Sequence, residues 1–172
     1  MDPIAFSLHI QDLENKCNLP QGFMHSLPNE NDWSFIIKTY AIFEALLSEL
    51  IAKISVKPEL RSFFLKLDMC SNPIGKLALL KKLSLLEEPE CKFIRALSDL
   101  RNIYAHNIKK ISASIEDTIV SFPSDKQKKI VQDLSFSLHK KDDFEKNKKQ
   151  CIWVASVMLL CQINERTYKK TL

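Results

Sequence analysis

The stretch from Trp33 to Ile54 constrains the fold more than any other part of the sequence. This stretch places apolar side chains on one face of an amphipathic helix of about six turns, and Asn31 or Asp32 supplies its N-cap. An apolar stripe of that length needs cover from other elements, so we expect this helix at the centre of a helical bundle. The apolar positions are Trp33, Ile36, Ile37, Tyr40, Phe43, Leu47, Leu50, Ile51 and Ile54.

Glycine is almost absent, with only two glycines in 172 residues. Such a chain offers few sites for hairpin turns, and it has no G-x-G-x-x-G or G-K-[ST] phosphate-binding loop. We therefore predict an all-α bundle of five or more helices with no strand. Because 45% of the residues are hydrophobic, residues 1–172 suffice for one sizeable core and are interpreted as a single domain.

Three parts are expected within that domain. Residues 1–30 form an N-terminal arm or short helix, residues 33–122 the motif-bearing core, and residues 124–172 a lysine-rich segment with a C-terminal core helix. Proline and capping signals predict the helices after the central one. One helix is expected at 59–68, and Asn72-Pro73 is expected to open the next, which runs to Leu86. The motif helix is expected from Pro89 to His106 or Asn107. A short helix that starts at the Ser114–Asp117 capping box and ends before Pro123 is then expected, followed by a last helix at 145–168.

Lysine is concentrated between Ser124 and Gln150, where acidic residues offset part of its charge. This pattern favours a solvated helical pair, and a phosphate-contacting surface is the alternative. The formal net charge of +4 is mild. It permits nucleic-acid binding without requiring it.

The five cysteines form no C-x-x-C pair, so neither a disulfide framework nor a zinc site is predicted and a reducing cytoplasm fits best. The N-terminus lacks the pattern of a signal peptide. The apolar run from Cys151 to Cys161 is too short to span a bilayer and is interpreted as a core helix, so no membrane association is expected.

Metal and cofactor sites are not expected either. His9 with Asp12, and His139 with Asp142 and Asp143, have spacings that one helical face can bring together. Neither group reaches the three or four protein ligands of a typical metal site. We interpret them as surface residues.

Chemistry is most clearly indicated by Arg101-Asn102-Ile103-Tyr104-Ala105-His106. Arg101 and His106 lie about 140° apart around a helix, separated by small or short side chains that leave a shallow groove. Guanidinium binds phosphate through a planar fork of donors, and imidazole exchanges protons near neutral pH. The pair suits phosphoryl transfer. Phe93, Leu97, Leu100 and Tyr104 share the apolar face of this helix, and Arg95, Asp99, Asn102 and His106 share the opposite face.

At these residues the sequence resembles the HEPN superfamily, whose signature is R-N-x-x-x-H near the end of a long helix. The flanking segments from Tyr40 to Leu47, Ile74 to Leu80 and Ile111 to Phe122 are similar to the mannitol operon repressor branch of that superfamily. The resemblance covers residues 33–122.

The resemblance implies a metal-independent endoribonuclease, a toxin or phage-defence effector, in which a ribose 2′-hydroxyl attacks the adjacent phosphate. His106 would be general base or acid and Arg101 would stabilise the added negative charge, while Asn102 orients the imidazole or contacts a partner chain. A single motif leaves one proton-transfer role unfilled, so a homodimer that joins two motifs is expected. A neutralising or triggering protein partner is expected as well.

Two positions leave alternatives open. Glu44 matches an acidic position that recurs in relatives, or it is a structural carboxylate. Some HEPN toxins carry a tyrosine two residues after the histidine, where this chain has Ile108. This difference argues against neutralisation by a nucleotidyltransferase.

The other function considered is a non-catalytic regulator or protein-interaction module. No helix-turn-helix with a basic recognition helix is evident, so direct DNA reading is poorly supported.

Overall fold

The computed structural model describes residues 3–55, 58–136 and 141–169, and every regular element within these ranges is a helix. The prediction of an all-α bundle is therefore confirmed. The α-helices are α1 (Pro3–Lys16), α2 (Phe23–Ser26), α3 (Asp32–Ile54), α4 (Pro58–Leu65), α5 (Lys76–Lys82), α6 (Glu88–His106), α7 (Ile115–Val120), α8 (Ser124–Ser135), α9 (Lys141–Lys146) and α10 (Lys148–Lys169), and the 3₁₀ helices are η1 (Leu27–Asn29) and η2 (Ile108–Lys110).

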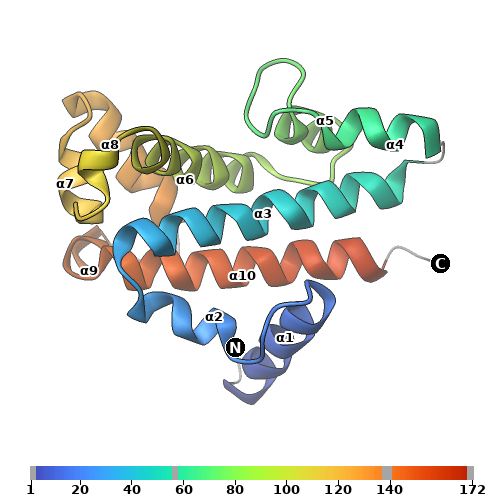
Figure 1. Ribbon diagram of the computed structural model, residues 1–172, viewed down its shortest axis with the longest axis horizontal. Coiled ribbons are helices and arrows are strands. Elements are labelled where there is room, and N and C mark those ends of the chain that lie inside the picture. The colour runs from blue at the N-terminus through green and yellow to red at the C-terminus, as the bar shows by residue number, and fades with distance from the viewer. Residues whose placement is uncertain (1–2, 56–57, 137–140, 170–172) are drawn as a thin grey trace.

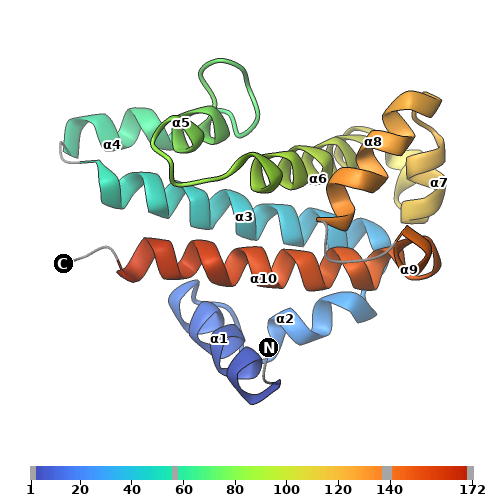
Figure 2. The ribbon, with the colours of Figure 1, turned by 180° about the vertical axis from the view of Figure 1, so that it is seen from behind.

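Helix α3 is the central helix, as its apolar stripe predicts. Its N-cap is Asn31, whose side-chain oxygen accepts a hydrogen bond from the Ser34 backbone N–H at 2.8 Å. Helix α10 runs alongside α3, and α6 packs on another side of it (Figures 1 and 2). These three helices carry most of the core.

The shorter helices cover the ends and faces of this central layer. Helices α1 and α2 lie on the α10 side, α4 and α5 lie over the C-terminal half of α3, and α7, α8 and α9 gather at the opposite end of the molecule (Figure 1). Residues expected to form an arm or short helix thus form two helices, α1 and α2, which pack through buried Ile10, Leu13 and Met24.

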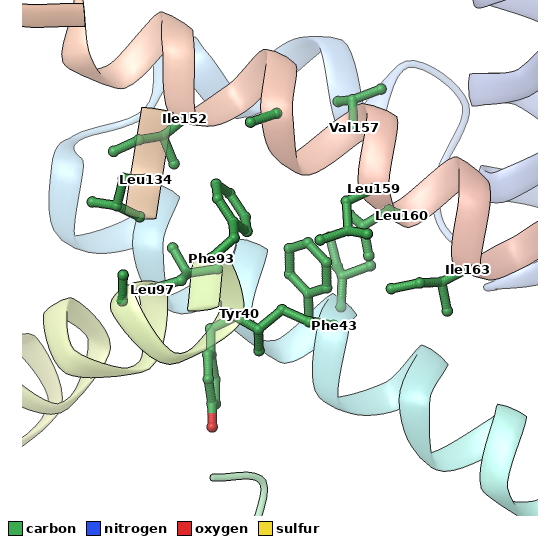
Figure 3. Packing of buried hydrophobic residues seen from close by; sticks show 14 of the residues in the cluster. Tyr40, Phe43, Phe93, Leu97, Leu134, Ile152, Val157, Leu159, Leu160 and Ile163 are labelled. Carbon is green, nitrogen blue, oxygen red and sulfur yellow. The ribbon is translucent and has the colours of Figure 1, made fainter. Parts of the chain in front are cut away.

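Apolar side chains from four helices meet inside the bundle (Figure 3). Phe43 of α3 and Phe93 of α6 are fully buried with ring centroids 6.0 Å apart, and Phe93 also meets Phe136 at 5.5 Å. Leu134 of α8 and Leu160 of α10 are buried in the same cluster. Removing a buried phenylalanine from such a core costs about 3–5 kcal/mol, so this cluster fixes where α6 lies.

The region between α4 and α6 differs from the sequence prediction. Helix α4 ends at Leu65 instead of Asp68, because the Asp68 carboxylate accepts hydrogen bonds from the backbone N–H groups of Cys70 and Ser71 and closes a turn. Asn72-Pro73 lies in that turn and does not open a helix. Helix α5 begins only after Gly75, where a Cβ atom would lie 2.5 Å from the Ser71 carbonyl oxygen.

Two further boundaries were predicted wrongly. Helix α5 ends at Lys82, because Ser84 adopts a left-handed backbone with φ of 54° and turns Leu85 into the core. Helix α10 begins at Lys148, while Glu145 belongs to the separate helix α9. At both boundaries a neighbouring apolar side chain is buried, Leu85 after α5 and Phe144 before α10. Helical periodicity alone does not predict such burial.

The lysine-rich segment forms α8 and α9, the expected helical pair, which also buries Ile130, Leu134 and Phe144. His139 lies outside the described residues, as do the side chains of Lys140, Lys141 and Asp142. The run from Cys151 to Cys161 is confirmed as a core helix inside α10. Among the residues that the structure describes, no helix combines the length and apolarity needed to cross a membrane.

Candidate functional site

Helix α6 carries the Arg/His motif in its last two turns. A capping box starts the helix, because the Glu87 and Glu90 side chains each accept a hydrogen bond from the other's backbone N–H. The predicted apolar face is confirmed: Phe93, Leu97, Leu100 and Tyr104 are all buried. The opposite face of the helix is thereby turned towards solvent and towards α8.

The C-terminal end of α6 is fixed to the rest of the fold through Tyr104. The Tyr104 carbonyl accepts a hydrogen bond from Trp33 Nε1 of α3 at 3.2 Å, and the Tyr104 hydroxyl donates to the Ala113 carbonyl at 3.1 Å. Burial raises the pKa of Tyr104 to about 12. Tyr104 is therefore a packing residue, as predicted, and it holds the last turn of the motif helix in place.

Arg101 is half-buried and is oriented by two neighbours. Its Nη1 donates a hydrogen bond to Asn102 Oδ1 at 3.0 Å, and its guanidinium carbon lies 5.2 Å from the centre of the Tyr40 ring. A cation over an aromatic face gains about 0.5–1 kcal/mol at an accessible site. The guanidinium is therefore held on the α3 side of the motif helix.

Tyr40 connects the predicted site residues on α3 and α6. Its hydroxyl points away from the apolar cluster (Figure 3) and accepts a hydrogen bond from Ser98 Oγ at 3.4 Å. Burial raises the pKa of Tyr40 to about 12, and the charges of both Glu44 and Arg101 act on its hydroxyl. The apolar stripe of the central helix predicted Tyr40 only as a core residue. A tyrosine within an apolar stripe could have indicated a polar contact at this position, because a buried hydroxyl needs a hydrogen-bond partner.

Glu44 lies one helical turn after Tyr40 and faces a buried cation. Its Oε1 is 3.9 Å from the Nζ of Lys76, and only 3% of the Lys76 side chain is exposed, whereas 46% of the Glu44 side chain is. A buried ammonium needs a nearby negative charge. This contact gives Glu44 a structural role as the counter-charge of Lys76. The charge of Glu44 also acts on the Tyr40 hydroxyl.

His106 is the last residue of α6 and is exposed. Its imidazole forms no hydrogen bond or ion pair with any residue in the part of the chain that the structure describes. The backbone then turns into η2, where Asn107 Oδ1 accepts a hydrogen bond from the Lys109 N–H and Ile108 is 81% exposed. The motif histidine is thus accessible to a ligand.

A groove of about 610 Å³ lies between α6 and α8 and is called the α6–α8 groove below. The groove was expected between Arg101 and His106, and this position was wrong: Ser98 and Asn102 line the groove, but Arg101, Ala105 and His106 do not. The structure thus places the groove on the α8 side of the motif, beside the Arg/His pair. Its other lining residues include Lys92 and Arg95 of α6 and Lys126, Lys129 and Asp133 of α8.

No cluster of three or more histidine, cysteine or acidic side chains suited to a metal occurs within the described ranges. His9 Nδ1 lies 3.3 Å from Glu165 Oε1. Asp12 instead pairs with Lys16 at 2.8 Å and accepts a hydrogen bond from Asn164. All five cysteines are free thiols, and Cys91 is fully buried, so it acts as a small core residue.

Comparison of the chain with protein-family models, with curated proteins and with solved structures finds no match.

Proposed function

We propose that the protein is a metal-independent endoribonuclease that uses Arg101 and His106. The observation that carries this proposal is an accessible, unpaired His106 at a helix end anchored by Trp33 and Tyr104, one and a half turns from a guanidinium oriented by Asn102 and Tyr40. An acid–base group must be free to meet substrate, and a phosphate-binding group must be held in place. The resemblance of the motif to the HEPN signature supports the same assignment.

The reaction needs two proton transfers and one charge stabiliser. A base takes the proton of the ribose 2′-hydroxyl as its oxygen attacks the adjacent phosphorus. An acid protonates the 5′-oxygen as its bond to phosphorus breaks, leaving a 2′,3′-cyclic phosphate and a free 5′-hydroxyl. His106 performs one of the proton transfers, and Arg101 binds the phosphate oxygens as negative charge builds on them.

A second copy of the chain would supply the missing proton-transfer group. Ile108 and Ile111 are 81% and 43% exposed immediately after the motif helix, so apolar surface lies next to His106. Such residues favour a contact between copies. Sedimentation should detect a dimer, and a chain that stays monomeric at every accessible concentration would count against a site shared by two motifs.

Asn102 and Glu44 act as supporting residues in this proposal. Asn102 accepts the hydrogen bond from Arg101, so it sets the direction of the guanidinium. Glu44 compensates the buried Lys76 ammonium and contributes to the field at Tyr40. Neither residue needs to touch RNA.

We further propose a cytoplasmic toxin or phage-defence role with a neutralising or triggering partner, since an unrestrained ribonuclease would harm its host. Five free thiols fit a reducing compartment. Cells expressing the intact chain should grow more slowly than cells expressing His106→Ala at a matched protein level. Equal growth would favour the alternative of a non-catalytic regulator.

The decisive experiment incubates the purified full chain with labelled RNA in the presence of a chelator and identifies the new ends. We expect cleavage that leaves a 2′,3′-cyclic phosphate, because the chain's own imidazole and guanidinium supply the chemistry. Arg101→Lys should be severely impaired, since an ammonium keeps the charge but loses the planar fork. Cleavage that depends on added magnesium would contradict the mechanism, and failure to cut any tested RNA would favour a binding module.

A further inference from the structure

Arg95 on the polar face of α6 is a cation whose buried Nε has no hydrogen-bond partner in the described part of the chain. Its guanidinium forms no ion pair within the ranges that the structure describes. Buried polar groups in proteins are almost always hydrogen-bonded, and leaving a charged donor unpaired is costly. A guanidinium in this state is suited to an anionic ligand.

Four cations and four carboxylates line the α6–α8 groove, and more of the carboxylates than of the cations are already in ion pairs. Two of its acids are already paired: Asp99 lies 3.0 Å from Lys126 Nζ, and Glu88 contacts Lys81 outside the groove. Arg95, Lys92 and Lys129 then face the two carboxylates of Asp125 and Asp133, and the charge of Glu88 also interacts with Arg95 and Lys92. The groove thus favours a ligand with negative charge and with some groups that can donate hydrogen bonds.

Asp133 provides a hydrogen-bond acceptor in the same groove. Burial raises the pKa of its carboxyl group, and the nearby charges of Lys129 and Lys92 act in the opposite direction. None of the residues lining the groove, all of which lie in the described part of the chain, is aromatic. The groove therefore cannot stack a base on a ring, as most base-reading RNA sites do.

Asn102 joins the groove to the candidate catalytic residues, which lie beside the groove and do not line it. Arg95, Asp99, Asn102 and His106 follow one another along a single face of α6, and Asn102 both lines the groove and accepts the hydrogen bond from Arg101. Arg95 and His106 are about 16 Å apart along the helix axis at 1.5 Å per residue. A strand positioned for cleavage at His106 would extend over the groove, whose volume falls within the range of about 300–1,000 Å³ typical of ligand pockets.

We propose that the α6–α8 groove binds the sugar–phosphate backbone of the RNA strand next to the cleaved bond, with Arg95 bound to a phosphate and Asp133 accepting a hydrogen bond from a ribose hydroxyl. This inference rests on the ribonuclease function proposed above. It predicts little base preference at the nucleotide in the groove, because no ring stacks on the base. It also predicts that RNA binds more tightly than DNA of the same sequence, because DNA lacks the 2′-hydroxyl.

The test measures binding without cleavage. A labelled single-stranded oligouridylate is titrated with the His106→Ala chain, alone and combined with Arg95→Gln, Arg95→Lys or Arg61→Gln, and anisotropy gives the affinity. Arg61→Gln is the matched control, because it removes the same charge from an exposed arginine whose Nη2 lies 3.9 Å from Glu49.

We expect Arg95→Gln to weaken binding about ten- to hundredfold, the range for a hydrogen-bonded charge, and Arg61→Gln to leave it unchanged. The slope of log affinity against log salt should fall by about 0.7 when one phosphate contact is lost. Arg95→Lys should retain that slope with intermediate affinity. Equal affinities for Arg95→Gln and Arg61→Gln would overturn the proposal.

Two further arms separate the alternatives. Uridine monophosphate should compete with the labelled oligouridylate far more weakly than an unlabelled strand does. Equal competition would overturn the assignment of the groove to an RNA strand and favour a free nucleotide as its ligand. Binding that depends on Arg95 in a chain that cleaves no RNA would refute the ribonuclease function and leave the groove as an RNA site.

If circular dichroism shows that Arg95→Gln does not fold, Lys129→Gln at an exposed position replaces it. This variant should bind RNA more weakly than the His106→Ala chain alone, and an unchanged affinity would contradict the proposal.

Discussion

The two ends of helix α6 use their polar side chains in opposite ways. At the N-terminal end, both oxygens of the nearly buried Glu90 carboxylate are occupied: Oε1 lies 2.8 Å from Arg166 Nη2, and Oε2 accepts hydrogen bonds from Arg166 Nη1 and the Glu87 N–H. At the C-terminal end, Arg101 has one hydrogen bond and an aromatic contact, and His106 has no partner among the described residues.

This difference separates stability from reactivity along one helix. A charge that is already satisfied by the fold has little left to offer a ligand, whereas an accessible and unpaired group is available for binding or proton transfer. Substitutions at the N-terminal end should therefore change the free energy of unfolding, and substitutions at the C-terminal end should change activity.

The largest effect is expected for His106→Ala, which should lower the rate of RNA cleavage by about 10² to 10⁴, the range for a positioned acid–base group. Its thermal unfolding should match that of the parent chain, because the exposed imidazole forms no hydrogen bond or ion pair with the residues that the structure describes. Single-turnover kinetics and calorimetry measure the two quantities. His9→Ala, at another exposed histidine, is the control, and an equal rate loss there would contradict the assignment.

Next in size is Arg166→Met, which should destabilise the chain by about 1–3 kcal/mol, since the buried Glu90 carboxylate and the Leu85 carbonyl lose their charged donor. Urea unfolding followed by circular dichroism gives the value. Arg61→Met on α4 should change stability by less than about 0.5 kcal/mol, as surface substitutions do. If the two variants unfold alike, the N-terminal end of α6 is not the stabilising end.

A smaller effect is expected just beyond the motif, at the cap of α7. Ser114→Ala removes the side chain that accepts a hydrogen bond from the Asp117 N–H, and the loss of an N-cap costs about 1 kcal/mol. Thermal unfolding should register this loss, while the rate of RNA cleavage stays that of the parent chain. A large loss of activity would mean that α7 also positions the site.

The smallest effect concerns the pH dependence of the same cap. Hydrogen bonds from Ser114 lower the pKa of Asp117 in the folded chain below its ordinary value. A depressed carboxyl pKa stabilises the fold above the unfolded-state pKa of aspartate, and this contribution disappears as the pH falls through the folded-state value. Acid titration should show a weaker loss of stability in Ser114→Ala than in the parent, and identical acid limbs would contradict the linkage.

Sequence patterns predicted the parts of the fold that depend on periodicity and caps. The central helix, its Asn31 cap and the buried face of α6 were all predictable, because each is encoded within a few neighbouring residues. The early end of α5 was not, since the left-handed Ser84 carries no glycine signal and depends on burial of Leu85 elsewhere in the bundle.

The site was predictable to the same extent. The exposure of His106 and the polar face of α6 follow from helical geometry. The stacking of Arg101 on Tyr40 joins residues that are far apart in the sequence, and the α6–α8 groove exists only because α8 packs against the motif helix. Contacts of this kind depend on how helices cross, which spacing within one helix does not determine.

The hydrogen bond from Trp33 to the Tyr104 carbonyl gives the protein a built-in optical reporter. The chain has two tryptophans, and Trp153 donates its own Nε1 hydrogen bond to the Met24 carbonyl at 2.7 Å, at a different junction of the bundle. In a Trp153→Phe chain, indole emission would come from Trp33 alone, beside the turn that carries His106. A shift of that emission on adding RNA or on raising the protein concentration would report movement at this turn without any attached dye.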